Sequence, residues 1–167
     1  MTVNGAAVHA YAHILYKGLL FMGAGCLLHA AGTARLTELG GLVRRLPWVF
    51  VLYMFAALSI SGMPLFNGFI SKTMTIAGTA EAHHTWLAAG MEIAAVGTFL
   101  SVGLKLPYFA FYSKPEYTGE LKPIPWNMYL AMALGASLCL VTGIFPKLLY
   151  GLLPIREGVA VYSPYIE

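Results

Sequence analysis

Long apolar runs separated by short polar connectors make up most of the chain. A helix needs about 20 apolar residues to cross a bilayer, and four runs are long enough: roughly 3–31, 47–77, 86–112 and 126–154. The connectors hold the polar, Gly and Pro residues that end helices. The pattern therefore predicts an all-α integral membrane protein with about four transmembrane helices, arranged as a single membrane domain over residues 1–167.

Composition supports a membrane protein and argues against several other classes. The chain is 59% hydrophobic and 10% charged, whereas soluble domains carry roughly a quarter charged residues. Its net charge of +3 is small and scattered, so we expect no nucleic-acid partner. There is no glycine fingerprint and no cysteine cluster for a nicotinamide, flavin, iron–sulfur or haem group. We therefore expect no cofactor, no metal and no catalytic chemistry in this chain.

The second run, 47–77, contains both a helix breaker and a charge. As one straight helix it would be about 46 Å long, which exceeds the bilayer core of about 30 Å. Gly62 and Pro64 interrupt it, because proline lacks a backbone donor and clashes with the preceding turn. A kink without function is one interpretation. Lys72, close behind the break, favours a discontinuous helix at a polar cavity, since irregular backbone at membrane depth must be covered by protein or water.

The first run carries His9, His13 and Lys17 at i, i+4 and i+8. This spacing places all three on one narrow stripe of a helix, about 12 Å long. A lysine deep in a membrane usually marks an ion or proton path, and histidine titrates near neutral pH. We interpret the stripe as a proton relay; the alternative is a set of hydrogen bonds between helices. A metal site is less favoured, because no carboxylate lies on the stripe.

Two charges in the third run are accessory candidates. Lys105 lies near one end of the run, where its stem can extend to the membrane surface. Glu92 lies about two turns from the opposite end, where it is an interfacial carboxylate, an exit gate or a contact with another protein of a complex.

Positive charges in the connectors predict the topology. Lysine and arginine occur in connectors 32–46 and 113–125 and are absent from the connector between the second and third runs. The positive-inside rule then places connectors 32–46 and 113–125 in the cytoplasm and both termini outside. The basic residues concerned are Arg35, Arg44, Arg45, Lys114 and Lys122.

Four motifs, in this order, resemble the C-terminal half of the antiporter-like proton-channel subunits: "HAYAHILYKGLLFMGAGCLLH", "LGGLVRRLPWVF", "SISGMPLFNGFISK" and "LSVGLKLPYFAFYSK". Mrp-type cation/proton antiporters, respiratory complex I and membrane-bound hydrogenases share these subunits. The fourth motif points to the Mrp D-type branch. The resemblance covers about residues 5 to 115 well, and the fourth run only by position.

The resemblance implies roles for four residues. Family members have a histidine-histidine-lysine series before their second broken helix, and a lysine or glutamate just after the break. These positions match His9, His13, Lys17 and Lys72. By resemblance, Lys17 is the central relay lysine, His9 and His13 extend its water chain, and Lys72 is the terminal proton-loading group.

The resemblance also implies partners. Family members contain two inverted helix repeats with flanking helices, and this chain matches only the last four spans. We therefore expect a companion that supplies the missing N-terminal helices, together with other membrane subunits of a hetero-oligomeric complex in a prokaryotic inner membrane. The expected ions are H⁺ and Na⁺ or another monovalent cation.

Three functions remain open on this basis. The first is a proton/cation-translocating subunit of a multisubunit Mrp-type antiporter. The second is the proton-pumping membrane subunit of a complex I-like NADH:quinone oxidoreductase or membrane-bound hydrogenase, in which partners perform the redox chemistry. The third is a structural module or split-subunit fragment without transport of its own; Lys17 and Lys72, in otherwise apolar spans, argue against it.

Overall fold

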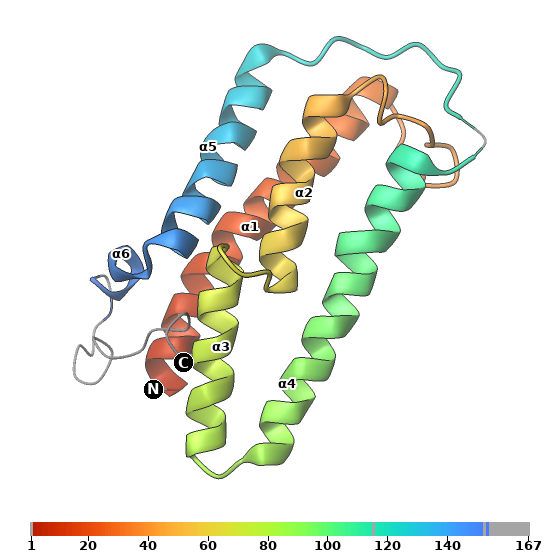
Figure 1. Ribbon diagram of the computed structural model, residues 1–167. Coiled ribbons are helices and arrows are strands. Elements are labelled where there is room, and N and C mark those ends of the chain that lie inside the picture. Colours follow the sequence, from red (N-terminus) through yellow and green to blue (C-terminus); the bar gives the residue numbers. More distant parts are fainter. Residues whose placement is uncertain (1, 115, 152, 154–167) are drawn as a thin grey trace.

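The structure, a computed structural model, describes residues 2–114, 116–151 and 153 and contains helices but no strands among them (Figure 1). The prediction of an all-α protein is confirmed. In chain order the elements are α1 (Thr2–Ala31), α2 (Pro47–Ser61), α3 (Asn67–Glu81), α4 (Thr85–Thr98), the π-helical segments η1 (Phe99–Lys105) and η2 (Tyr108–Tyr112), α5 (Trp126–Ile144) and α6 (Pro146–Tyr150).

Three stretches of described helix are long and apolar enough to cross a membrane: Val3–Ala31, Thr85–Tyr112 and Trp126–Ile144. The helix α2 is apolar but shorter, with 15 residues. Figure 1 shows α3 continuing from the end of α2, so that the two together run alongside α1. The chain is thus an integral membrane protein with four spans that alternate in direction, the second of them discontinuous.

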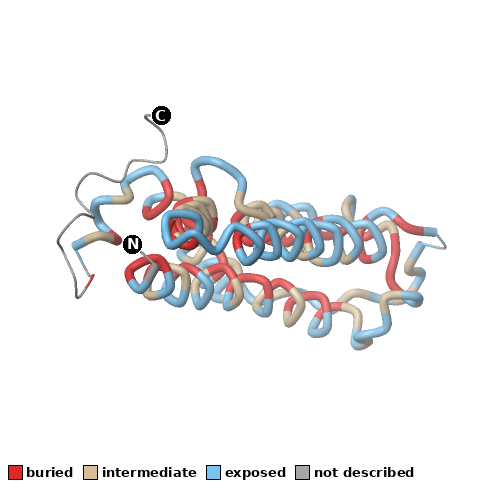
Figure 2. Tube along the Cα trace, turned by 90° about the horizontal axis from the view of Figure 1, so that it is seen from below, coloured by how far each residue is buried: buried red, intermediate tan, exposed pale blue. Residues whose placement is uncertain are grey.

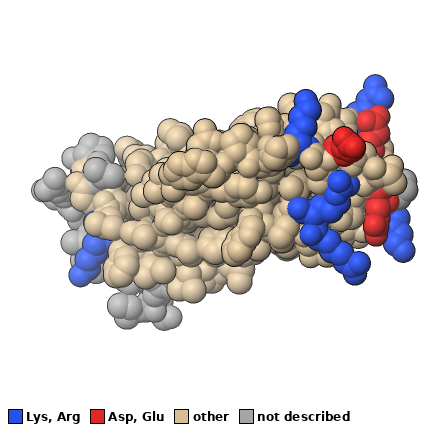
Figure 3. All heavy atoms as spheres, turned by 90° about the horizontal axis from the view of Figure 1, so that it is seen from above, with Lys and Arg blue, Asp and Glu red and all other residues tan. Residues whose placement is uncertain are grey.

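The first and third connectors meet at one end of the bundle. The backbone N–H of Tyr117 donates to the carbonyl of Gly40 at 3.0 Å, and Arg45 Nη1 donates to the carbonyl of Gly119, also at 3.0 Å. On the face drawn in Figure 3, charged side chains gather mostly at one end of the molecule. The two basic connectors therefore lie on the same side, as predicted; that this side is cytoplasmic stays a prediction.

The buried core lies between α1, α2 and α5. Along α1, buried positions alternate with exposed ones (Figure 2), and its Tyr16 and Leu19 are fully buried, as are Tyr53 of α2 and Met132 of α5. By contrast, Ala88 is the one buried residue of α4. The core fixes α1 and the broken α2–α3 span relative to each other, whereas α4 closes one side of the space between them.

The helix ends differ from the predicted runs in two places. The fourth run was predicted as 126–154, but α5 ends at Ile144, because Phe145 leaves the helical conformation (φ −114°, ψ 72°) and Pro146 starts the short helix α6. Residue 154 lies outside the described residues. The second run extends beyond 77, since α3 continues to Glu81.

Candidate functional site

The predicted discontinuity is confirmed, and it begins with a glycine-capped helix end. Gly62 has φ +80°, in the left-handed region that other residues avoid. The Gly62 N–H donates to the Ser59 carbonyl at 3.0 Å, and the Met63 N–H donates to the Leu58 carbonyl at 3.1 Å. This is the Schellman pattern that ends helices. Pro64 follows and cannot continue the helix.

Lys72 donates a hydrogen bond to the Ile60 carbonyl, which has lost its usual helical donor at the break. In an unbroken helix the Ile60 carbonyl would accept from the N–H of residue 64, but Pro64 has none. Instead, Lys72 Nζ, one turn into α3, donates to the Ile60 carbonyl. The lysine stem passes Gly62 so closely that a Cβ there would lie 3.2 Å from Lys72 Cδ. The lysine cation thus lies at the carbonyl end of α2, where a helix carries partial negative charge.

A second close contact positions α3 on α2. A Cβ on Gly68 would overlap the Ser59 carbonyl oxygen, so only glycine fits there. Beside it, the Ser59 hydroxyl donates to Asn67 Oδ1 at 2.6 Å, and both side chains are fully buried. These contacts fix the first turn of α3, and hence the position of Lys72.

The residues of the α1 stripe lie side by side, as their spacing predicts. The ring centroids of His9 and His13 are 6.0 Å apart, and those of His13 and Tyr16 are 5.4 Å apart. Lys17 Nζ lies 5.8 Å from the centroid of the Phe21 ring, within the range of a cation–π interaction. His9 and Lys17 are partly buried, whereas His13 is exposed.

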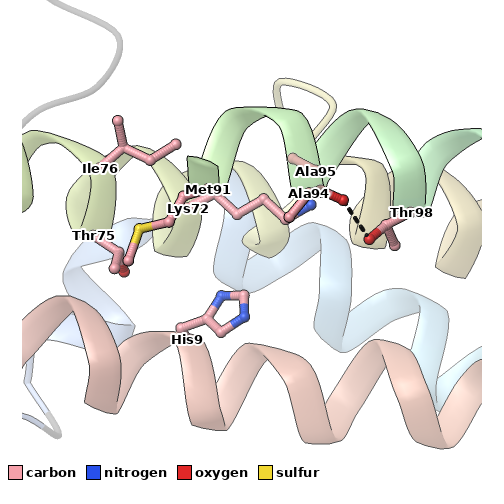
Figure 4. A pocket seen from close by; sticks show the side chains of 8 residues that line it. All are labelled: His9, Lys72, Thr75, Ile76, Met91, Ala94, Ala95 and Thr98. Carbon is pink, nitrogen blue, oxygen red and sulfur yellow. Dashed lines mark hydrogen bonds between the residues drawn. The ribbon is translucent and has the colours of Figure 1, made fainter. Parts of the chain in front are cut away.

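A cavity brings the α1 stripe and Lys72 together. It has a volume of about 530 Å³, and all four predicted relay residues line it. An adjoining cavity of about 270 Å³ shares His9 and Lys72 with it (Figure 4). Every ionisable side chain in the two linings except Tyr16 is a base: His9, His13, Lys17 and Lys72.

His9, on α1, contacts a side chain of α3. Its Nδ1 lies 3.1 Å from the hydroxyl of Ser71, the fully buried neighbour of Lys72. This contact joins residues 62 positions apart in the chain. The spacing within each helix predicted the stripe, but it did not indicate Ser71.

Two hydroxyl groups that were not predicted from the sequence, on α4 and η1, also line the larger cavity. Thr98 and Ser101 line it, and their spacing of three residues in an apolar run was the available signal. Behind them, the Tyr53 hydroxyl donates to the carbonyl of Val102 at 3.2 Å, which ties η1 to α2.

The accessory candidates lie elsewhere. Glu92 and Lys105 are both exposed, and neither lines the two cavities. Within the described residues, no three His, Cys, Asp or Glu side chains come together in a way that could hold a metal ion.

Sequence comparison identifies the family. Residues 1–101 match the family model described as the transmembrane region of NADH:quinone oxidoreductases and Mrp antiporters. The chain therefore belongs to this family, as the motifs predicted, and its sequence is that of an antiporter-like membrane subunit.

Two curated relatives represent different branches. The chain is 33% identical over 160 residues to the A-type subunit of the Na⁺/H⁺ antiporter of Alkalihalophilus pseudofirmus, covering 88% of this chain and 20% of the relative. It is 32% identical over 151 residues to hydrogenase-4 component B of Escherichia coli, covering 84% of this chain and 22% of the relative. The chain thus spans less than a third of the length of either relative. Because this antiporter relative is of the A type, membership of the D-type branch stays a prediction.

A solved structure has the same fold. A chain in an Mrp complex from a Dietzia species superposes with a TM-score of 0.73 at 23% identity, covering 83% of this chain and 34% of that one. The antiporter-like membrane fold that the sequence predicted is confirmed.

Proposed function

We propose that this chain is the part of an ion-translocating membrane subunit that relays protons among Lys17, His13, His9 and Lys72, in a multisubunit cation/proton antiporter. The observation that carries the proposal is the cavity lined by these four bases from two helices. A void of about 530 Å³ has room for several waters, each of which occupies about 30 Å³ in the liquid.

The order of the groups supports a path. On α1, Lys17, His13 and His9 follow one another at single-turn spacing. From His9 the path crosses the cavity to Lys72 on α3, since both side chains line it. All four bases line one polar cavity, so waters within it can bridge one base to the next.

The exposure of two bases of the stripe supports the proposal that this chain has membrane-protein partners. His13 is exposed and Lys17 partly so, and a charged side chain facing hydrocarbon is costly. We propose that further membrane helices of the assembled complex cover this side of the cavity, a companion that supplies them being one of the proposed partners. The proposed location is a prokaryotic inner membrane with connectors 32–46 and 113–125 in the cytoplasm, and the proposed ions are H⁺ and Na⁺ or another monovalent cation.

The experiment is cation-driven proton flux in membrane vesicles that contain the assembled complex. Lys17→Met and Lys72→Met should each abolish flux while the complex still assembles, whereas Lys105→Met, outside the cavity, should keep most of it. Wild-type flux in Lys17→Met or in Lys72→Met would contradict the relay.

A second candidate function is the proton-pumping membrane subunit of a redox-driven complex. The similarity to hydrogenase-4 component B supports it. Purification of the intact complex in mild detergent, with its subunits identified by mass, distinguishes the two. Iron–sulfur or flavin proteins in the complex would favour the redox pump, and small membrane subunits alone would favour the antiporter. Recovery of this chain alone would favour a structural module or fragment.

A further inference from the structure

Ser71 has a hydroxyl whose proton is directed at the backbone. Its Oγ donates to the Gly68 carbonyl at 3.1 Å, one turn back on α3, which is a common arrangement for serine in a helix. A hydroxyl has one proton to give and two lone pairs to accept with. The group that lies 3.1 Å from Ser71 Oγ on the other side, His9 Nδ1, is therefore placed to donate to it.

We propose that Ser71 is a positioning residue that holds His9 in the tautomer with its proton on Nδ1, so that Nε2 is the atom that exchanges protons with the cavity. The inference rests on the proposed relay. Which ring nitrogen carries the proton is set by the hydrogen bond that the other atom makes, and a lone pair on Nδ1 would face a lone pair on Ser71. The tautomer thus follows from the Ser71–Gly68 bond.

The contact between His9 and Ser71 lies where α1 and α3 pack closely. Ser71 is fully buried, so water does not compete for its hydroxyl. One turn before His9, α1 and α3 approach so closely that a Cβ on Gly5 would lie 3.0 Å from the backbone of Thr75. Figure 4 shows the His9 ring standing up from α1 between Thr75 and Lys72. One ring nitrogen therefore faces Ser71, while the ring also borders both cavities, so its two nitrogens have different environments.

The ionisable groups near His9 are few. On its own helix they are His13, Lys17 and Tyr16, and on α3 the group is Lys72. The helix that also lines the two cavities, α4, contributes apolar side chains and the Thr98 hydroxyl to the linings. With Nδ1 protonated, Nε2 can accept a proton that Lys72 releases and pass it to the next group.

The first test reads the tautomer directly. The complex is prepared with isotope-labelled histidine, and the His9 signals are assigned by comparison with His9→Gln in nitrogen and carbon magnetic resonance. The wild type should show the Nδ1–H tautomer, and Ser71→Ala should shift it towards Nε2–H. A wild type in the Nε2–H form would overturn the inference, whatever happens to transport, and this result does not depend on whether the variant assembles.

The second test measures transport against pH. Ser71→Ala should lower proton flux about tenfold, the factor that corresponds to one hydrogen bond, and change its pH profile, whereas Ser71→Thr should restore both. In a His9→Gln background, Ser71→Ala should cause no further change. The matched control is Ser137→Ala, which removes an exposed α5 hydroxyl that donates to the Ala133 carbonyl at 2.8 Å and should leave flux unchanged.

The outcomes separate the two proposals. If His9→Gln itself leaves flux intact, the relay through His9 fails and the inference that depends on it fails as well. If His9→Gln impairs flux but Ser71→Ala keeps the wild-type rate and pH profile, the relay stands and the positioning role of Ser71 is wrong.

Discussion

The ammonium of Lys72, on α3, donates a hydrogen bond to the carbonyl of Ile60, in the last turn of α2, across the break that separates the two helices. The break leaves this carbonyl without its helical donor, because Pro64 has no N–H. Lys72 thus satisfies a backbone carbonyl that the helix break leaves without a donor. Any event that draws the lysine away must leave the carbonyl to water or to another donor, which links the position of Lys72 to hydration of the break.

Replacing Lys72 should stop transport. Lys72→Met keeps most of the stem that packs along Gly62 but removes the donor to Ile60 and the ammonium that we propose as a proton-holding group. We expect proton flux to fall by about 100-fold or more, in the range typical for loss of an acid–base group, while native electrophoresis still detects the complex. The control, Lys105→Met, replaces an exposed lysine outside the cavity; a comparable loss there would point to a general charge effect.

Lys17→Met should have a similar effect, since Lys17 lines the same cavity as Lys72. A milder substitution is available at Phe21, whose ring centroid lies 5.8 Å from Lys17 Nζ. Phe21→Leu leaves the lysine in place and removes only a cation–π interaction, so flux should change by about threefold or less. Retention of flux in Lys17→Met would show that the path does not include this residue.

Gly62→Ala should destabilise the break. A Cβ at φ +80° costs about 1–2 kcal/mol, and it would also lie 3.2 Å from Lys72 Cδ. The expected result is a lower midpoint for thermal inactivation of the purified complex. Gly90→Ala is the matched control, because a Cβ at Gly90 meets no atom within 4 Å. Equal midpoints for the two variants would argue against a strained turn at Gly62.

Gly68→Ala should be more disruptive than Gly62→Ala. The added Cβ would overlap the Ser59 carbonyl oxygen, a backbone atom that cannot rotate away. The start of α3 must then move away from α2, which separates Lys72 from Ile60. We expect the amount of assembled complex in membranes to fall sharply, and Gly25→Ala, where a Cβ meets nothing within 4 Å, to assemble like the wild type.

The topology can be tested by cysteine labelling. Cys26 and Cys139 are buried, and replacing both with alanine gives a background for single cysteines. Arg44→Cys and Glu120→Cys should react with an impermeant thiol reagent from the cytoplasmic side, and His84→Cys from the opposite side. Reaction of Arg44→Cys and Glu120→Cys from different sides would contradict the fold, and reaction of both from outside would reverse the orientation inferred from charge.

Much of the architecture could be predicted from the sequence, because each feature that predicts it involves residues close together in the chain. Bilayer thickness sets the length of an apolar run, and a glycine followed two residues later by a proline, as at Gly62 and Pro64, is a local signal for a helix end. The spacing of His9, His13 and Lys17 needs only the pitch of a helix to form a stripe. The end of α5 was misplaced because the apolar run continues past Ile144 while the backbone turns at Phe145 and Pro146.

The sequence by itself therefore determined that the chain is helical and apolar and where its second span breaks, and it indicated His9, His13, Lys17 and Lys72 as candidates for a proton relay. Only the tertiary structure decided which atoms they meet: Lys72 with the carbonyl of Ile60, and His9 with the hydroxyl of Ser71. These contacts cross 12 and 62 positions of the chain, and they depend on the close approach of α3 to α2 at Gly68 and to α1 at Gly5. Periodicity within a helix contains no information about the neighbour against which that helix packs, so the partner of each base becomes visible only when the helices are assembled.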